Sequence, residues 1–309
     1  MVERPGRSIA STESALRRPP ISAAARPVAK LTFLSGQLPL YVLALLFAAM
    51  FMTPFLWTVG SSLKSGLEVR EFPPALVPSS PRFQNYVDIW AVVPLAVFFW
   101  NSLQVTIVAM IGQIASATLV AYGFARFRFP FRDAVFLLVI STILLPREVV
   151  LIPTFLLFRE LHWLDTLLPL IVPSFLGGGA FFIFLLRQFF LTLPRELDEA
   201  AKLDGANSFQ ILMRILLPLS RPALATVAIF SFLAHWNDFL EPLIYLNSPR
   251  NFTVALGLRY FQTLPNEAQE PREQLLMAAS LVVTLPILLI FFAAQRYFVR
   301  GIVMTGLKG

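Results

Sequence analysis

The sequence runs from Lys30 to Lys64, and again from Asp88 to Arg126, without a charged residue. Each of these runs exceeds the ~20 apolar residues that a helix needs to cross a bilayer. The whole chain is 57% hydrophobic and 14% charged, whereas soluble proteins are typically ~45–50% apolar and ~25% charged. The sequence therefore predicts an all-α, polytopic membrane protein.

Six segments are apolar and long enough to span a membrane: residues 39–59, 95–124, 134–157, 166–186, 222–246 and 274–295. The third is interrupted by Arg147 and Glu148, and the second half of the fifth carries several polar residues. Charged side chains within a span are costly, so they usually face protein or water. We expect six transmembrane helices, with the third and the fifth the least regular.

The basic residues are distributed unevenly between the segments that join these spans. With the N-terminus inside, the inner segments hold 17 of the 25 Lys and Arg residues and the outer loops hold 7, while Arg147 lies within a span. Cytoplasmic segments carry such an excess, so both termini are expected in the cytoplasm. Residues 1–33 are basic and have no apolar core, which indicates a disordered cytoplasmic tail rather than a cleaved signal peptide.

The most polar stretch of the chain, ELDEAAKLDGANSFQILMRILLPLSRP (196–222), falls on this inner side. Acids at its start favour the N-terminus of a helix, and the spacing of Asp198 and Lys202 predicts a weakly stabilising pair. A narrow apolar face is expected from Leu197, Ala200 and Ala201. Glycine tolerates the left-handed conformation of a helix C-cap, so Asp204-Gly205 should end this first short helix.

A second helix is expected directly after that turn, with Asn207 or Ser208 as its cap. The spacing of Phe209, Leu212, Met213 and Leu216 is typical of an amphipathic helix, which Pro218 and Pro222 should end. The residues alone leave two interpretations open. The stretch is either a membrane-surface helix without a partner or a docking element for a soluble cytoplasmic protein.

Several motifs resemble those of a known family. EAA (199–201), DGA (204–206) and ILLP (215–218) resemble the EAA signature of ABC-importer permeases. AYGFARFRFPFR (121–132), LIPTF (151–155), WNDFLEPLIYL (236–246) and RYFVRGIVMTGLKG (296–309) are similar to the carbohydrate-uptake branch, in particular to the smaller permease of maltose-type systems. The resemblance covers roughly residues 35–309. One departure is Phe131, where relatives often have a glycine.

The resemblance implies a type I ABC importer permease fold with six transmembrane helices. It divides the chain into the tail 1–33, a first helix and outer loop at 34–94, a core transmembrane domain at 95–298 and a cytoplasmic tail at 299–309. Within the core, residues 192–221 would form the coupling loop that lies in a groove of the ATPase subunit. The residues implied in that contact are Glu199, Ala200, Ala201, Asp204, Gly205, Ala206, Phe209, Leu212 and Pro218.

Two further groups of residues are candidates for function. We expect Asn237, Asp238 and Glu241 to line the translocation pathway, with Asn237 and Glu241 on one helical face; the alternative is that the fifth span ends early and these residues lie at the head-group level. Arg147 and Glu148 either satisfy each other or mark a bend in the pathway.

The outer loop at residues 247–273 is long, and long loops are usually functional or disordered. Its first part, NFTVALGLRYF (251–261), carries enough apolar residues to pack. In the maltose-type family the corresponding loop reaches the sugar cleft of the binding protein. The resemblance therefore implies that Tyr260 and Phe261 contact an extracytoplasmic binding protein; the alternative is a re-entrant cap that seals the bundle.

Several kinds of site are excluded by the residues themselves. The chain has no cysteine, so it holds neither a disulfide nor a thiolate metal site. The two histidines are isolated, and no metal site or catalytic residue is expected. No G-x-x-x-x-G-K-[ST] motif occurs, so the chain has no phosphate-binding P-loop. The basic residues form no aromatic-interleaved patch of the kind that binds nucleic acid.

These observations together predict a permease subunit of a bacterial, binding-protein-dependent ABC importer of a sugar or related polyol-type solute. The chain would lie in the inner (plasma) membrane and contact its lipid, beside a second related permease, two ATPases that bind ATP and Mg²⁺, and a binding protein. It would hold no cofactor of its own. Alternatives are a permease of the same fold for a non-sugar solute, a secondary transporter with its own ion-coupling site, and a membrane-embedded enzyme.

Overall fold

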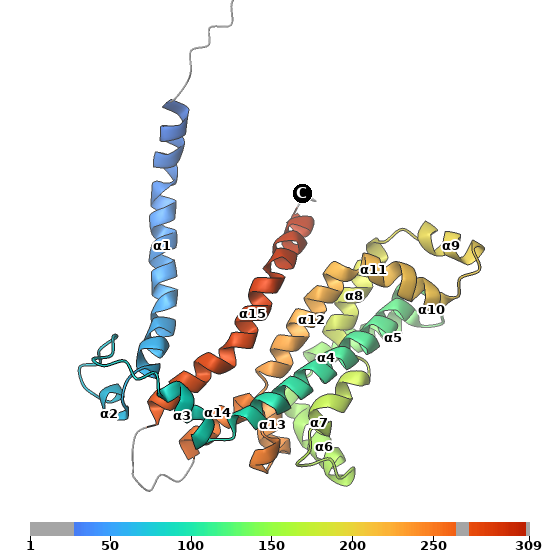
Figure 1. Ribbon diagram of the computed structural model, residues 1–309. Coiled ribbons are helices and arrows are strands. Elements are labelled where there is room, and N and C mark those ends of the chain that lie inside the picture. Colours follow the sequence, from blue (N-terminus) through green and yellow to red (C-terminus); the bar gives the residue numbers. More distant parts are fainter. Residues whose placement is uncertain (1–27, 264–271, 307–309) are drawn as a thin grey trace, which may run out of the picture. The chain divides into compact units, whose positions relative to one another are not determined.

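A computed structural model describes residues 28–263 and 272–306, which contain helices and no strands (Figure 1). The expected N-terminal tail up to residue 27, the loop at 264–271 and the last three residues lie outside this part of the chain. The chain divides into two compact units, Met1–Pro54 and Phe55–Gly309. All the elements that build the candidate site belong to the second unit.

The elements follow one another in a fixed order along the chain. The first part contains α1 (Val28–Ser62), α2 (Gly66–Val69), α3 (Asn85–Val92) and α4 (Leu95–Arg126). The middle contains α5 (Arg132–Ser141), η1 (Thr142–Leu144), α6 (Arg147–Glu160), α7 (Leu168–Ile171), η2 (Val172–Phe175) and α8 (Ala180–Thr192). The last part contains α9 (Glu196–Leu203), α10 (Ser208–Ile211), η3 (Leu212–Leu216), α11 (Leu217–Leu219), α12 (Arg221–Trp236), α13 (Leu240–Tyr245), η4 (Pro249–Asn251), α14 (Val254–Thr263) and α15 (Glu273–Gly306).

Four helical stretches are long and apolar enough to cross a membrane: Leu38–Ser62, Leu95–Arg126, Leu168–Thr192 and Glu273–Ala294. They confirm the first, second, fourth and sixth expected spans. Two further pairs of helices reach the same length only together, and they are bent by 98° (Arg132–Leu144 with Arg147–Glu160) and by 82° (Ser208–Leu219 with Arg221–Trp236). The described residues therefore contain up to six spans, and the third and fifth are the irregular ones, as expected.

The bend in the third span lies at Pro146. Leu145, the residue before it, has an extended backbone (φ −76°, ψ 117°), because proline disfavours the helical conformation in its predecessor. Pro146 then begins α6 with Arg147 as the first helical residue. The charged pair at 147 and 148 thus follows a break in the helix rather than causing one.

The predicted boundaries of the fifth span were wrong at the C-terminal end. The helix does not continue to residue 246, because α12 ends at Trp236 and α13 begins only at Leu240. The polar residues in between therefore lie at a helix end, which the early-ending alternative anticipated. Asn237 and Glu241 accordingly do not share a face of one helix.

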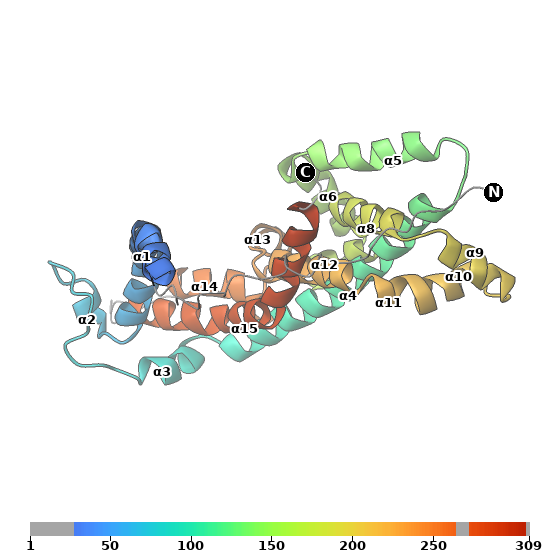
Figure 2. The same cartoon turned by 90° about the horizontal axis from the view of Figure 1, so that it is seen from above.

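The core is built around α4, which lies beside α8 and α12 in both views (Figures 1 and 2). Small residues on α4 allow this close approach. Ala109, Ala117, Ala121 and Ala125 are fully buried. A Cβ atom on Gly178 would lie only 2.5 Å from the backbone nitrogen of Ala117, so the expectation of close packing at the three glycines is confirmed for this one.

Candidate functional site

The loop at residues 192–221 begins with helix α9, whose end has a defined geometry. Gly205 has a left-handed backbone with φ +84°. Its N–H donates to the carbonyl of Lys202 (3.0 Å), and the N–H of Ala206 donates to that of Ala201 (2.9 Å). These two bonds form a Schellman C-cap, in which glycine is favoured because the left-handed region is strained for other residues.

The second helix is capped by Asn207, as the sequence predicted. Its side chain accepts a hydrogen bond from the N–H of Gln210, and the side chain of Gln210 accepts one from the N–H of Asn207, both at 2.9 Å. This reciprocal arrangement is a capping box. It fixes the direction in which the chain returns to the membrane domain.

The buried face of this second helix differs from the predicted one. The chain forms a π-helix over Leu212–Leu216, whose i→i+5 hydrogen bonds shift the helical period. Ile211, Leu212 and Leu216 are fully buried, whereas Phe209 and Met213 remain exposed. The amphipathic spacing read from the sequence therefore placed two residues on the wrong face.

The whole loop is held to the C-terminal end of α4 by polar contacts. Arg126 forms an ion pair with Asp198 (Nε to Oδ2, 2.8 Å), and their side chains are only 6% and 11% exposed. Arg126 also donates to the carbonyl of Leu193 (3.1 Å), and the hydroxyl of Tyr122 donates to the carbonyl of Ser208 (3.0 Å). The loop is thus anchored before, within and after α9.

The ion pair corrects two expectations about α9. Asp198 is buried and pairs with Arg126 across the fold rather than with Lys202 along its own helix. The buried face of α9 consists of Asp198 and Ala201, whereas Leu197 and Ala200, which were expected on an apolar face, are exposed. Because one buried charge is left uncompensated when its partner is removed, losing either side chain typically costs ~3–5 kcal/mol.

The candidate docking residues accordingly fall into two groups. Ala201 and Leu212 are buried and Ala206 is half-buried, so these three hold the loop in place. The remaining six are exposed: Glu199, Ala200, Asp204, Gly205, Phe209 and Pro218. Leu203, near the end of α9, is 89% exposed although it is apolar. The loop therefore presents a continuous stretch of unburied side chains on a firmly anchored backbone.

A second polar group lies where α6 begins and α13 begins. Arg147 forms an ion pair with Glu241, so Arg147 and Glu148 do not satisfy each other. The side chain of Arg147 is 72% exposed and that of Glu241 29% exposed. Asp238 lies close enough to Arg147 to interact electrostatically with it. The described acids here outnumber the single arginine.

Asn237 ends α12 instead of lining it. Its backbone N–H and its side-chain amide both donate to the carbonyl of Leu233, at 3.2 and 2.9 Å. The carboxylate of Asp238 accepts a 3.5 Å hydrogen bond from the N–H of Glu241 at the start of α13. The three predicted pathway residues therefore occupy consecutive helix ends, and only Glu241 is joined to another part of the fold.

Sequence reasoning missed the polar contact inside the bundle. Gln113 on α4 accepts a hydrogen bond from the hydroxyl of Ser231 on α12, and His235 lies 3.3 Å from the same oxygen. A glutamine in the middle of an otherwise apolar span was the available signal. It joins α4 to α12 one to two turns before the polar helix end at Asn237.

The segment at residues 249–261 packs against the N-terminal end of α4. The side chain of Asn101 donates to the carbonyls of Arg250 (2.8 Å) and Phe252 (3.0 Å), and the hydroxyl of Ser102 accepts from the N–H of Val254 (2.8 Å). This part is structured, as its apolar content predicted. These contacts attach it to the same helix that anchors the 192–221 loop.

The two aromatic residues predicted to contact another protein are placed differently. Phe261 is only 2% exposed and belongs to the core, so its burial does not support a contact with another protein. Tyr260 is half-buried and packs edge-on against Phe98 and Phe252, with ring centroids 6.4 and 5.6 Å apart. The polar part of this loop, 264–271, lies outside the described residues.

Asp165, which the sequence did not single out, ties two loops together. Its carboxylate accepts hydrogen bonds from the N–H groups of Asn247 (3.0 Å) and Ser248 (2.8 Å) and from the side chains of Ser248 and Asn251. Partial burial raises the pKa of this carboxyl, but the hydrogen bonds from Ser248, Asn247 and Asn251 outweigh it and hold the pKa well below the usual range. The group is therefore ionised at neutral pH.

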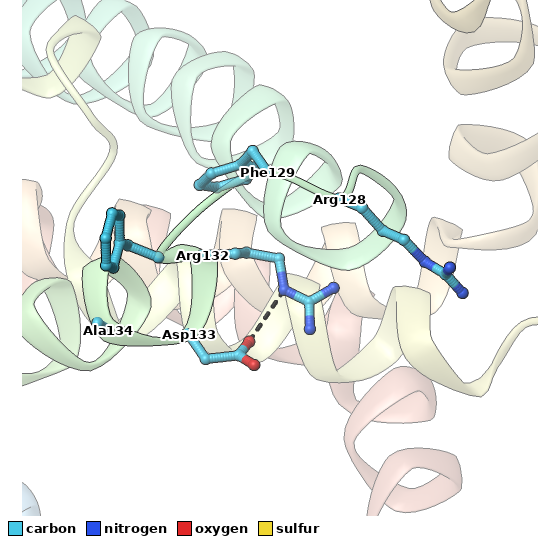
Figure 3. A pocket seen from close by; sticks show the side chains of 6 residues that line it. Arg128, Phe129, Arg132, Asp133 and Ala134 are labelled. Atoms are coloured by element: carbon cyan, nitrogen blue, oxygen red, sulfur yellow. Dashed lines mark hydrogen bonds and ion pairs between the residues drawn. The ribbon is translucent and has the colours of Figure 1, made fainter.

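A pocket of about 370 Å³ lies at the turn between α4 and α5. Its lining residues are Arg128, Phe129, Phe131, Arg132, Asp133 and Ala134. Figure 3 shows Arg132 joined to Asp133, a 2.9 Å ion pair, while Arg128 extends away from them. Phe131 has φ +59°, so the chain keeps at this position the left-handed conformation in which relatives often have glycine. No group of three or more potential metal ligands occurs among residues that the structure describes.

Comparison with known proteins identifies the family. Residues 114–304 match the model of the binding-protein-dependent transport system inner membrane component. The chain is 34% identical to the arabinooligosaccharides transport system permease protein AraQ of Halalkalibacterium halodurans, over 75% of this chain and 81% of that protein. It is also 34% identical to the sn-glycerol-3-phosphate transport system permease protein UgpE of Pectobacterium atrosepticum, over 76% of this chain and 85% of that protein.

The fold agrees with a solved structure. A chain of a bacterial ABC transporter involved in the import of the acidic polysaccharide alginate superposes with a TM-score of 0.76 and 22% identity, over 89% of this chain and 99% of that chain. The predicted all-α permease fold is therefore confirmed. The chain belongs to the family of binding-protein-dependent transport system inner membrane components, the multi-pass permease subunits of ABC importers.

Proposed function

We propose that this permease subunit imports a sugar or related polyol-type solute, driven by ATP that two partner ATPases bind with Mg²⁺ and hydrolyse. A second, related permease completes the pathway, and an extracytoplasmic binding protein delivers the solute. The observation that carries the proposal is the anchored 192–221 loop with its exposed face. The assignment of a carbohydrate rests on the similarity to the arabinooligosaccharide permease.

The charge at the polar helix ends favours a neutral solute. Arg147 is already paired with Glu241, and Asp238 and Glu148 lie near it, so the described charges in this group sum to a negative value. A pathway of that sign disfavours a phosphate ester and accepts a hydroxyl-rich, uncharged molecule. This argument supports an oligosaccharide over sn-glycerol 3-phosphate, the solute named for the other relative.

In this mechanism the chain performs no chemistry. Closure of the ATPase dimer moves α9 and its exposed face, and the anchored loop passes that movement to the helix bundle. The bundle then opens the pathway alternately to the two sides of the membrane. Both termini and the 192–221 loop lie in the cytoplasm.

The docking role is tested by uptake and by co-purification of the ATPases with Glu199→Ala and Gly205→Val. Both variants should insert into the membrane, and both should lose most uptake. The first removes an exposed charge at the docking face, and the second strains the left-handed turn by ~1–2 kcal/mol. Gly205→Asn is the matched control, because asparagine tolerates this conformation. Full uptake in Glu199→Ala and Gly205→Val would rule out docking by this loop.

The solute class is tested separately in the assembled complex. Binding protein loaded with an arabinooligosaccharide should stimulate ATP hydrolysis, whereas the same protein offered sn-glycerol 3-phosphate should not. Stimulation by the phosphate ester alone would replace the sugar by the non-sugar alternative while leaving the permease assignment intact.

A further inference from the structure

Helix α4 carries contacts to both of the segments that face other proteins in the proposed function. It runs from Leu95 to Arg126 over 32 residues and contains no proline. At 1.5 Å per residue it is about 48 Å long, which is longer than the ~30 Å hydrocarbon core of a bilayer. A single unbroken helix therefore reaches from one side of the membrane domain to the other.

At its C-terminal end, α4 holds the 192–221 loop through buried groups. Arg126 pairs with Asp198 within α9, and Tyr122 donates to the carbonyl of Ser208 at the start of α10. Both side chains on α4 are largely shielded from solvent. The neighbouring apolar residues of α4 and of the loop, including Ala121, Ala125 and Leu212, belong to one buried cluster. Docking on α9 therefore acts directly on α4.

At its N-terminal end, α4 holds the 249–261 segment in a comparable way. Asn101 and Ser102 bind three backbone groups of this segment. Phe98 is fully buried there, and a Cβ atom on Gly257 would lie 2.2 Å from the Phe98 ring. The segment thus approaches α4 so closely that only glycine fits at position 257.

The covalent route out of the 192–221 loop is less direct. After α10 the chain passes through the π-helix and α11, and it then bends by 82° before α12 begins. Such breaks absorb movement through changes of backbone dihedral angles. Rigid transmission from α9 is therefore better served by the buried contacts to α4 than by the chain itself.

We propose that α4 transmits the position of α9 to the 249–261 segment, with Arg126 and Tyr122 as positioning residues at one end and Asn101 and Ser102 at the other. The proposal rests on the proposed function, since it assumes that α9 docks on an ATPase. It assigns to these four side chains a role in coupling rather than in binding ATPase, solute or binding protein.

The experiment uses the full transporter with a spin label at position 259, which is exposed on α14. Because the chain contains no cysteine, Arg259→Cys labels this site alone. Trapping the ATPases with ATP and orthovanadate should change the mobility of the label. In Arg126→Gln and Asn101→Ala that change should fall by at least half, although ATPases still co-purify and still trap nucleotide.

Three further variants separate coupling from loss of fold. Tyr122→Phe removes one hydroxyl and keeps the ring, so it should reduce the label response in a protein of wild-type thermal stability. Arg126→Lys keeps the positive charge and should restore part of the response. Arg128→Gln, an exposed arginine one half-turn further along, is the matched control and should leave the response unchanged.

The outcomes are distinguishable. A full label response in both Arg126→Gln and Asn101→Ala, or no response in the unmutated protein with trapped ATPases, would overturn the role of α4. Failure of the unmutated chain to co-purify with any ATPase would instead contradict the proposed function, and the role of α4 would fall with it.

Discussion

At the scale of single residues, the sequence predicted turns better than partners. Gly205 and Asn207 were recognised because local backbone chemistry determines a C-cap and an N-cap, and both have the expected geometry. The partner of Asp198 was not recognised. Arg126 lies 72 positions earlier in the chain, and no local rule connects the two. The same holds for Arg147 and Glu241.

Asp165 offers a stability test at this scale. We predict that Asp165→Asn lowers the free energy of unfolding by about 1–3 kcal/mol at neutral pH, because a charged acceptor of several hydrogen bonds is lost. Thermal unfolding in detergent is the measurement. Asp133→Asn is the control, since the Asp133 side chain is 76% exposed and surface pairs contribute little. Equal melting temperatures for both variants would contradict this role.

The pH dependence of that effect follows from the lowered pKa of Asp165. A carboxyl whose pKa is depressed in the folded state stabilises the fold above its unfolded pKa of ~3.9, and this contribution is lost as the pH falls through the folded pKa. The difference between Asp165→Asn and the unmutated chain should therefore be constant above about pH 5 and shrink in acid. A difference that grows on acidification would contradict this assignment.

At the scale of elements, hydropathy predicted where helices lie but not where they break. Charge-free runs placed the first, second, fourth and sixth spans, because length and polarity are properties of the segment itself. The end of α12 and the π-helix at Leu212–Leu216 depend on tertiary packing and were missed. The bend at Pro146 was approximated through Arg147 and Glu148, which follow the proline.

The packing of α8 against α4 is tested at Gly178. A Cβ atom there meets the backbone of Ala117 at 2.5 Å, whereas one on Gly177 meets nothing within 4 Å. Both glycines have positive φ angles, so Gly177→Ala serves as a matched control for backbone strain. We predict that Gly178→Ala costs ~1–3 kcal/mol more than Gly177→Ala in thermal unfolding. Equal costs would show that the helices do not depend on this close approach.

At the scale of the whole molecule, the resemblance to permeases predicted more than any single pattern. The all-α fold and the family are confirmed, because six spans and several separated motifs constrain the same architecture. The sidedness of the membrane domain remains a prediction from the distribution of basic residues. Solute and partner identity depend on surfaces shared with other chains, which one sequence does not contain.

Sidedness is tested with single cysteines in the naturally cysteine-free chain. Lys202→Cys on α9 should react with a membrane-impermeant maleimide in inside-out vesicles and not in intact spheroplasts. Arg250→Cys, exposed in η4, should show the reverse. Labelling of both positions from the same side would contradict an odd number of spans between them and the assigned topology.

The central claim is that α9 docks on an ATPase, and a photo-cross-linker at Leu203 tests it most directly. This side chain is 89% exposed near the end of α9 and makes little contact within the chain. In whole cells we predict a cross-link to a nucleotide-binding ATPase subunit, whereas a cross-linker at Leu119, an exposed position within the membrane span α4, should give none. Cross-linking of Leu203 to lipid alone would contradict the claim and favour a membrane-surface helix without a partner.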